Sequence, residues 1–141
     1  MLKKFFKKKE SPSPNNKNIL IAALLVHAAK IDNKYTDSEK IMIKRALIEL
    51  NSMSENEADE TIKIAEQKEK DSNQIIEFTK EIKKSPLEFR IKIIELLWKI
   101  IYSDSVADEY ETTLIRRVCG LLYISAKDSG EIKLKIEGLK K

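Results

Sequence analysis

Acidic side chains with a repeated spacing are the strongest chemical signal in this sequence. The stretch from Asp32 to Glu39 recurs, altered, 72 residues later as the stretch from Asp104 to Glu111. Crowded carboxylates repel one another, and a hard divalent cation relieves that repulsion by taking several oxygen ligands. With one Cys and one His in the chain, Ca²⁺, Mg²⁺ and Mn²⁺ are the candidate ions. The two stretches are therefore candidate metal sites.

The same stretches also have a purely structural interpretation. Thr36-x-x-Glu39 and Asp108-x-x-Glu111 are capping boxes, in which the two side chains satisfy backbone N–H groups at a helix start. Acidic residues in a first helical turn, here Asp37 and Glu109, are favoured by the helix dipole. Asp32 and Asp104 are the carboxylates that capping does not explain. The spacing is not that of an EF-hand, so metal binding and capping both remain open.

Catalytic motifs are absent from the sequence. There is no Gly-rich phosphate loop, no His-Glu-x-x-His, no Gly-x-Ser-x-Gly and no plausible Cys/His pair. The single cysteine, Cys119, lies in a helical apolar pattern that predicts a buried, inert thiol. The single histidine, His27, is interpreted as a satisfied or half-exposed helix residue. We expect no enzyme activity and no organic cofactor.

The elements that must position these acidic residues are helices. With three Gly, three Pro and 42% hydrophobic residues, the chain favours an all-α bundle. Two helix–acidic turn–helix units are predicted to form a pseudo-repeat.

The helix start signals in the sequence are Thr36, Ser54, Ser85 before Pro86, and Ser125. The seven predicted helices cover about residues 17–31, 37–51, 55–69, 73–84, 86–103, 108–123 and 125–138. In the fifth, the stripe of Leu87, Ile91, Ile94, Trp98 and Ile101 is predicted to be core.

The first 18 residues differ from the rest of the chain in charge. They carry six Lys and one Glu, and the remaining residues sum to a charge of −1. We interpret residues 1–18 as a basic flexible tail and linker, and residues 19–141 as one helical domain. The high pI therefore belongs to the tail, and we expect no nucleic-acid partner. An alternative is weak contact of the Lys/Phe tail with an anionic membrane surface. The predicted location is cytoplasmic, with a peripheral position at the inner membrane surface as that alternative.

The paired acidic turns resemble those of the TerB-like family, the tellurite-resistance-associated helical domain also found at the N-terminus of the co-chaperone DjlA. Family turns have the form Ala/Ser-Asp-Gly-x-x-Asp/Ser-x-x-Glu. Here Lys30 to Glu39 and Tyr102 to Glu111 are similar, as are the segments Leu97-Trp98 and Leu114-Ile115-Arg116-Arg117-Val118. This chain departs from the pattern where Asn33 and Ser105 replace the Gly, and Ser adopts the left-handed conformation less readily.

The resemblance has several implications for function. It implies an all-helical, non-enzymatic domain whose acidic turns bind a divalent cation, in a stress-response setting. An alternative is a protein-interaction module, co-chaperone-like or membrane-associated, in which the turns only cap helices and the protein partner is unknown. Carried over to this sequence, the ligand positions are Asp32, Glu39, Asp104 and Glu111, with Asp37, Asp108 and Glu109 as additional candidates.

Overall fold

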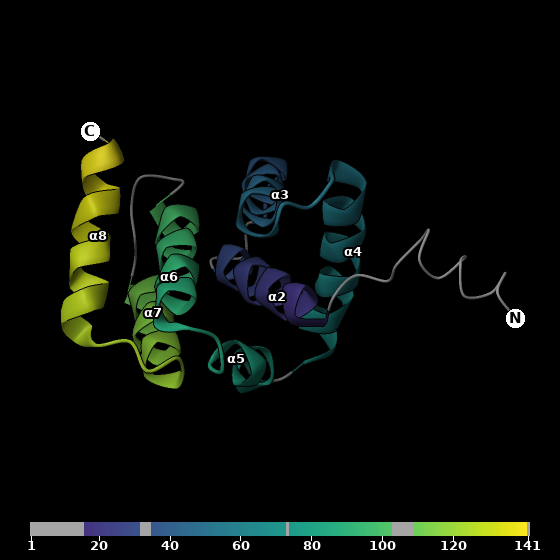
Figure 1. Ribbon diagram of the computed structural model, residues 1–141. Coiled ribbons are helices and arrows are strands. Elements are labelled where there is room, and N and C mark those ends of the chain that lie inside the picture. The colour runs from purple at the N-terminus through teal and green to yellow at the C-terminus, as the bar shows by residue number, and fades with distance from the viewer. Residues whose placement is uncertain (1–15, 32–34, 73, 103–108, 141) are drawn as a thin grey trace, which may run out of the picture.

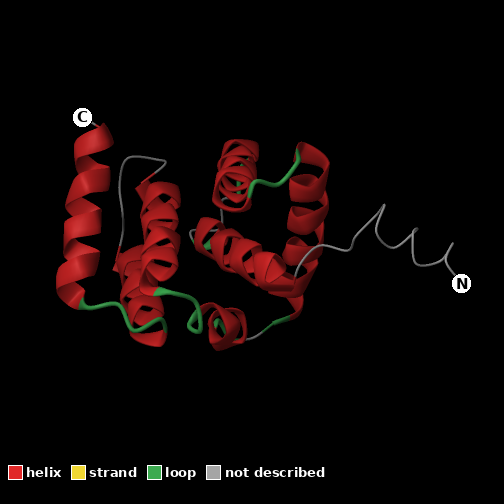
Figure 2. Ribbon diagram, viewed as in Figure 1, coloured by secondary structure: helices red, strands yellow, loops and turns green. Residues whose placement is uncertain are grey.

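The computed structural model describes residues 16–31, 35–72, 74–102 and 109–140. Every regular element in these ranges is a helix, so the all-α prediction is confirmed (Figure 2). The helices are α2 (Asn16–Lys30), α3 (Asp37–Asn51), α4 (Glu55–Asp71), α5 (Ile76–Ile82), α6 (Leu87–Ile101), α7 (Glu109–Leu121) and α8 (Ala126–Lys140). α2 begins among the last residues of the predicted tail; the remainder of that tail lies outside the described residues.

Helix α2 is the centre of the bundle. Its apolar side chains cover most of its circumference, and nine of its residues are buried. It packs against α3, α4, α5 and α6, with α4 as its most extensive neighbour. In Figure 1, α4 lies at one edge of the molecule and α8 at the other, with α2 and α6 between them. Each fully buried aliphatic side chain contributes roughly 1.5–3 kcal/mol to stability relative to an exposed one. The packing of α2 therefore joins α3, α4 and α5 to α6.

Capping boxes begin both α3 and α4, as the sequence predicts. Thr36 accepts a bond from the Glu39 backbone N–H, and Ser54 does the same for Glu57. Ser125 likewise accepts a bond from the Asp128 N–H at 3.1 Å at the start of α8.

The predicted Ser85 cap of α6 is wrong. The residue before the helix is Pro86, whose ψ of 153° is extended, and no side chain caps this end. Ser85 is buried, and its hydroxyl has no hydrogen-bond partner in the described chain. Arg90 instead donates to the Ser85 carbonyl at 2.8 Å and to the Leu122 carbonyl at 2.8 Å, which ties this turn to the end of α7.

Helix α6 supplies the core that it shares with α7 and α8. Ile94, Trp98 and Ile101 of the predicted stripe are buried, and α6 packs on α7 and α8. Leu87 departs from the prediction, since it is 46% exposed in the first turn of α6. The predicted pseudo-repeat is not shown, since residues 103–108 of the second unit lie outside the described residues. Across the described ranges, no helix combines the length and apolar character needed to cross a bilayer.

Candidate functional site

The predicted metal ligands divide into described and undescribed residues. Glu39 lies in the first turn of α3, and Asp37 is exposed beside it. Asp32, Asp104 and Asp108 lie outside the described residues. Glu109 and Glu111 belong to the first turn of α7, but their side chains are also outside the description. The structure therefore places one of the four main predicted ligands, and the convergence of the set stays a prediction.

The Glu39 carboxylate is engaged in the capping box. Its Oε1 accepts a 2.9 Å hydrogen bond from the Thr36 backbone N–H, and the Glu39 N–H donates to Thr36 Oγ1 at 3.1 Å. The hydrogen bonds of the carboxylate within the described chain all use Oε1. The structural interpretation of Glu39 is thus confirmed. Among the described residues, Oε2 of Glu39 therefore has no hydrogen-bond partner.

A partly buried polar cluster lies beside this turn, and we call it the first-turn cluster: His27, Lys30, Tyr35, Glu66 and Glu69. Tyr35 donates from its hydroxyl to Glu66 Oε2 at 2.7 Å. Glu69 accepts from Lys30 Nζ at 2.8 Å, and its other oxygen lies 3.0 Å from His27 Nδ1. The cluster connects the C-terminal end of α2 and Tyr35, which precedes α3, to the C-terminal half of α4. Its position explains the half-exposed histidine predicted from sequence.

The electrostatics of the first-turn cluster are dominated by carboxylates. Burial raises the pKa of Tyr35, and the hydrogen bond to Glu66 and the charges of Glu66, Glu39 and Glu69 raise it further. Burial alone would also raise the pKa of Glu69, but hydrogen bonds from Lys30 and His27 hold it below its usual value. Three carboxylates therefore act on one side chain next to the predicted turn.

Cations within the protein neutralise much of this charge. Lys40 lies 3.2 Å from Glu66, and Lys30 and His27 both contact Glu69. In the described part of the chain, no group of three or more His, Cys, Asp or Glu side chains is placed to hold a metal ion. The resident partners of Glu66 and Glu69 are therefore protein cations.

Glu66 and Glu69 are the site residues that sequence reasoning missed. Glu69 lies 39 and 42 residues from its partners Lys30 and His27, and Glu66 lies 31 residues from Tyr35. No motif connects α4 to the turn. A weak signal exists in the spacing: residues three apart on a helix share one face, so the two carboxylates must point the same way. Which neighbour they face is decided by the packing of α4 on α2.

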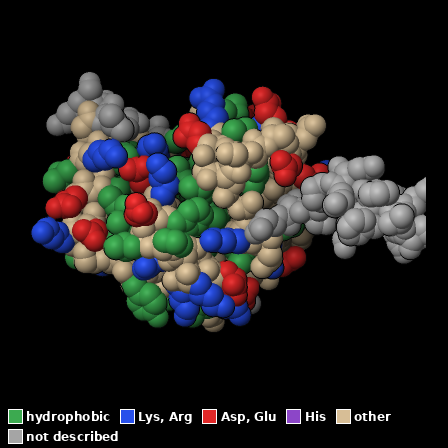
Figure 3. All heavy atoms as spheres, viewed as in Figure 1, with side chains coloured by type: hydrophobic (Ala, Val, Ile, Leu, Met, Phe, Trp, Pro, Cys, Tyr) green, Lys and Arg blue, Asp and Glu red, His purple; other side chains and the backbone are tan. Residues whose placement is uncertain are grey.

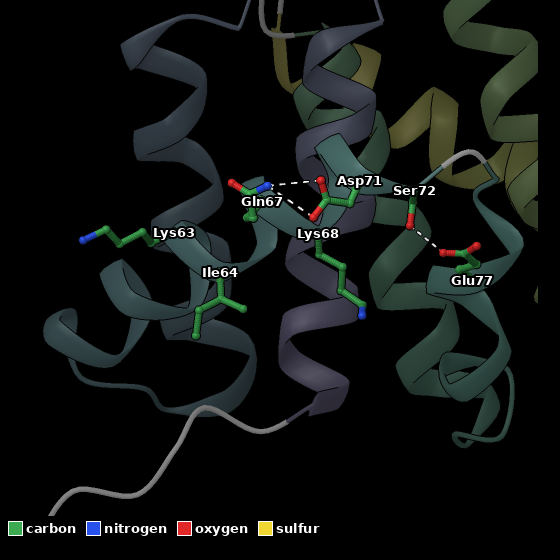
Figure 4. Close-up of a pocket in the computed structure, with 7 residues that line it drawn as sticks. All are labelled: Lys63, Ile64, Gln67, Lys68, Asp71, Ser72 and Glu77. Atoms are coloured by element: carbon green, nitrogen blue, oxygen red, sulfur yellow. Dashed lines mark hydrogen bonds between the residues drawn. The ribbon is translucent and has the colours of Figure 1, made fainter.

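A surface cavity of about 660 Å³ lies along α4 and the start of α5 (Figure 4). Its polar side chains bond to one another: Gln67 donates to Asp71 at 3.1 Å, and Ser72 donates to Glu77. The Lys63 and Lys68 ammonium groups extend away from these pairs in Figure 4. The two carboxylates of this cavity are therefore already hydrogen-bonded to neighbouring side chains, and the cavity is open to solvent. We do not assign a reactive site to it. On the face in Figure 3, acidic and basic side chains are interspersed.

The thiol of Cys119 fits the prediction of an inert residue. The side chain is buried at 5% exposure. Burial raises its pKa, which a hydrogen bond with Ser129 only partly offsets. A protonated thiol is a poor nucleophile and a poor metal ligand.

This chain is similar to a known protein family. Residues 18–134 match the family described as "Tellurite resistance protein TerB". Comparison with curated proteins and with solved structures finds no match. TerB domains are generally non-catalytic helical domains, and the all-helical bundle with its capped first turn fits that description. Because the match covers most of its length, this chain belongs to the TerB family.

Proposed function

We propose that this chain is a non-catalytic TerB domain that binds a divalent cation at the first acidic turn. The observation that supports the proposal is the grouping of three carboxylates around Tyr35: after burial and the Glu66 hydrogen bond, the charges of Glu66, Glu39 and Glu69 raise the pKa of Tyr35. Asp32 precedes Tyr35 by three residues, and Glu39 follows it by four. A cation there gains oxygen ligands and reduces the repulsion among the carboxylates.

The proposed roles follow from the bonds already present. Glu39 keeps its cap through Oε1 and offers Oε2 to the ion, so helix α3 does not have to unwind on binding. Asp32 supplies the carboxylate that no cap explains. In the second turn, Asp104 and Glu111 are the corresponding proposed ligands, with Asp37, Asp108 and Glu109 as additional candidates. The ion is Ca²⁺, Mg²⁺ or Mn²⁺, because oxygen is the donor on offer.

Calorimetry with each of the three chlorides tests the proposal. The wild type is expected to bind, and Asp32→Asn with Asp104→Asn to lose at least about tenfold in affinity, or about 1.4 kcal/mol. Glu39→Gln should weaken binding while keeping the cap, since Gln also completes a capping box.

The matched control is Glu57→Gln, which makes the same change in the Ser54 box of α4. It should leave metal affinity unchanged. Absence of heat and of any thermal shift at saturating metal would contradict the proposal, because a ligand that binds only the folded state must stabilise it.

A second candidate function is a protein-interaction module in which the turns act only as caps. The observation that favours it is a shallow groove between α3 and α6, of about 160 Å³, with Met42, Ala46, Leu96 and Ile100 among its lining residues. Ile41, adjacent in sequence, is 50% exposed. Crosslinking to a protein partner that survives chelator and the double Asn substitution, and is lost in Ile41→Ser, would favour this function. Leu134→Ser is the control, since Leu134 is equally apolar and exposed on α8.

A further inference from the structure

A further groove lies apart from the residues of the first-turn cluster. This groove, of about 370 Å³, is formed by α6, α7 and the first half of α8. Its buried wall consists of Trp98, Ile115, Cys119 and Ile124, which are 4%, 1%, 5% and 6% exposed. The volume is within the range of small-molecule sites, about 300–1,000 Å³, and the lining is mainly apolar, as in such sites.

Two glycines keep the groove open. Gly120 of α7 and Gly130 of α8 both line it, and a Cβ atom at either position would meet nothing within 4 Å. Neither has a positive φ, so the backbone does not require glycine. Each costs helix stability of roughly 1 kcal/mol relative to Ala. The space between the two helices is therefore real room, unfilled by side chains.

Three polar groups belong to the residues that line the groove: one buried indole N–H and two cationic side chains. Trp98 Nε1 is buried and has no acceptor in the described chain, although buried indole N–H groups usually find one. Lys133 Nζ lies 5.7 Å from the centroid of the Trp98 ring. Neither Lys133 nor Arg116, which lines the rim, forms an ion pair with the described residues. An apolar groove with one buried donor lacking an acceptor, and with two cations that form no ion pair with the described residues, is complementary to an amphipathic anion.

We propose that this groove binds a small carboxylate with an apolar body, such as a medium-chain fatty acid. The hydrocarbon lies between Gly120 and Gly130 against Ile115 and Trp98, and the carboxylate pairs with Arg116 and Lys133. A ligand oxygen is the acceptor that Trp98 Nε1 lacks, and the flexible Lys133 side chain moves off the ring to admit it. Binding is non-covalent, because burial raises the pKa of the Cys119 thiol and keeps it protonated. The proposal is independent of metal binding at the acidic turns.

Titration with octanoate tests this site directly, because Trp98 is the only tryptophan and its fluorescence reports on the groove. Saturable change is expected with octanoate, with affinity at least about tenfold weaker for octan-1-ol and octylammonium, since each tenfold is about 1.4 kcal/mol. No saturable change, or equal affinity for the alcohol, would overturn the proposal.

A Cβ atom at Gly120 or Gly130 meets no atom within 4 Å, and Leu is a better helix former than Gly, so we expect Gly120→Leu and Gly130→Leu to fold with a side chain that occupies the groove. Each is expected to weaken octanoate binding at least about tenfold, and Lys133→Gln to weaken it severalfold. Gly138→Leu, which also meets no atom and lies outside the groove, is the matched control and should bind as the wild type does. Unchanged octanoate affinity in both filled variants would place the ligand elsewhere and refute the assignment.

Discussion

The two capping boxes that begin α3 and α4 have nearly the same local geometry and very different surroundings. In the first, the Thr36 N–H to Glu39 distance is 2.9 Å; in the second, the Ser54 N–H to Glu57 distance is 3.2 Å, and both return bonds are 3.1 Å. The first lies beside the partly buried carboxylates of the first-turn cluster. Near the second, Lys44 makes exposed contacts with Asp59 and Glu55 at 3.1 and 3.4 Å.

The difference shows that a capping box by itself carries no functional information. Local sequence fixes the cap, because its bonds join residues three apart. The potential around the cap is fixed by α4, which is distant along the chain. The carboxylates near the first box are partly buried, whereas those near the second are exposed, so a cation gains more at the first box.

Among the variants that test this difference, Glu69→Ala is expected to have the largest effect on stability. Its side chain is 11% exposed and contacts Lys30 and His27, so removal leaves two polar groups unpaired at the α2–α4 interface. We expect a loss of about 2 kcal/mol in the free energy of unfolding, measured by urea denaturation.

Asp59→Ala is the control for Glu69→Ala, because it removes an exposed partner of Lys44. Exposed pairs contribute about 0–1 kcal/mol, so the loss should be under about 0.5 kcal/mol. Equal losses in the two variants would mean that the two surroundings do not differ energetically.

Acidification should act on the same residue, with a smaller effect than deletion because protonated Glu69 still fills the interface. Its folded pKa is lowered, so its contribution is complete above its unfolded pKa of about 4.5 and is lost as the pH falls through the folded pKa. Glu95, held by Lys135, shifts in the same direction. Thermal unfolding from pH 6 to pH 2 should show declining stability below about pH 4.5, with a shallower decline in Glu69→Gln. An identical decline in that variant would show that other groups carry the acid dependence.

Thr36→Ala and Ser54→Ala should each lose about 1 kcal/mol of unfolding free energy, because each removes one N-cap acceptor of similar geometry. Chemical denaturation of both variants without added metal is the measurement. A Thr36→Ala loss that clearly exceeds that of Ser54→Ala would mean that the first cap also supports the polar cluster.

The smallest effect is expected for Glu39→Gln and Glu57→Gln in the absence of metal. Gln can accept the same backbone bond, so each should change stability by less than about 0.5 kcal/mol. Differential scanning calorimetry in chelator measures both. With metal added, the proposed site predicts that their melting temperatures separate, and coincidence under both conditions would argue against the site.

Much of the architecture follows from local sequence. The predicted bounds of α3 agree with the structure, and those of the other helices differ by one to three residues. Capping, helical periodicity and the rarity of Gly and Pro are short-range properties, so one sequence is enough to read them. The Ser85 error has the same origin. The sequence Ser-Pro-x-Glu is compatible with a helix that begins after Ser85 or after Pro86, and the structure shows the second, with Pro86 in the extended conformation before the helix.

The site depends on contacts that local sequence does not contain. Glu39 was predictable as a cap, but Glu66 and Glu69 enter the first-turn cluster only because α4 packs along α2. The groove between α7 and α8 likewise needs Trp98 of α6 as its wall. The sequence by itself determined where the helices begin and which carboxylates flank the turns. The tertiary structure decided which charges meet there, because burial and distance between remote residues set the electrostatic potential.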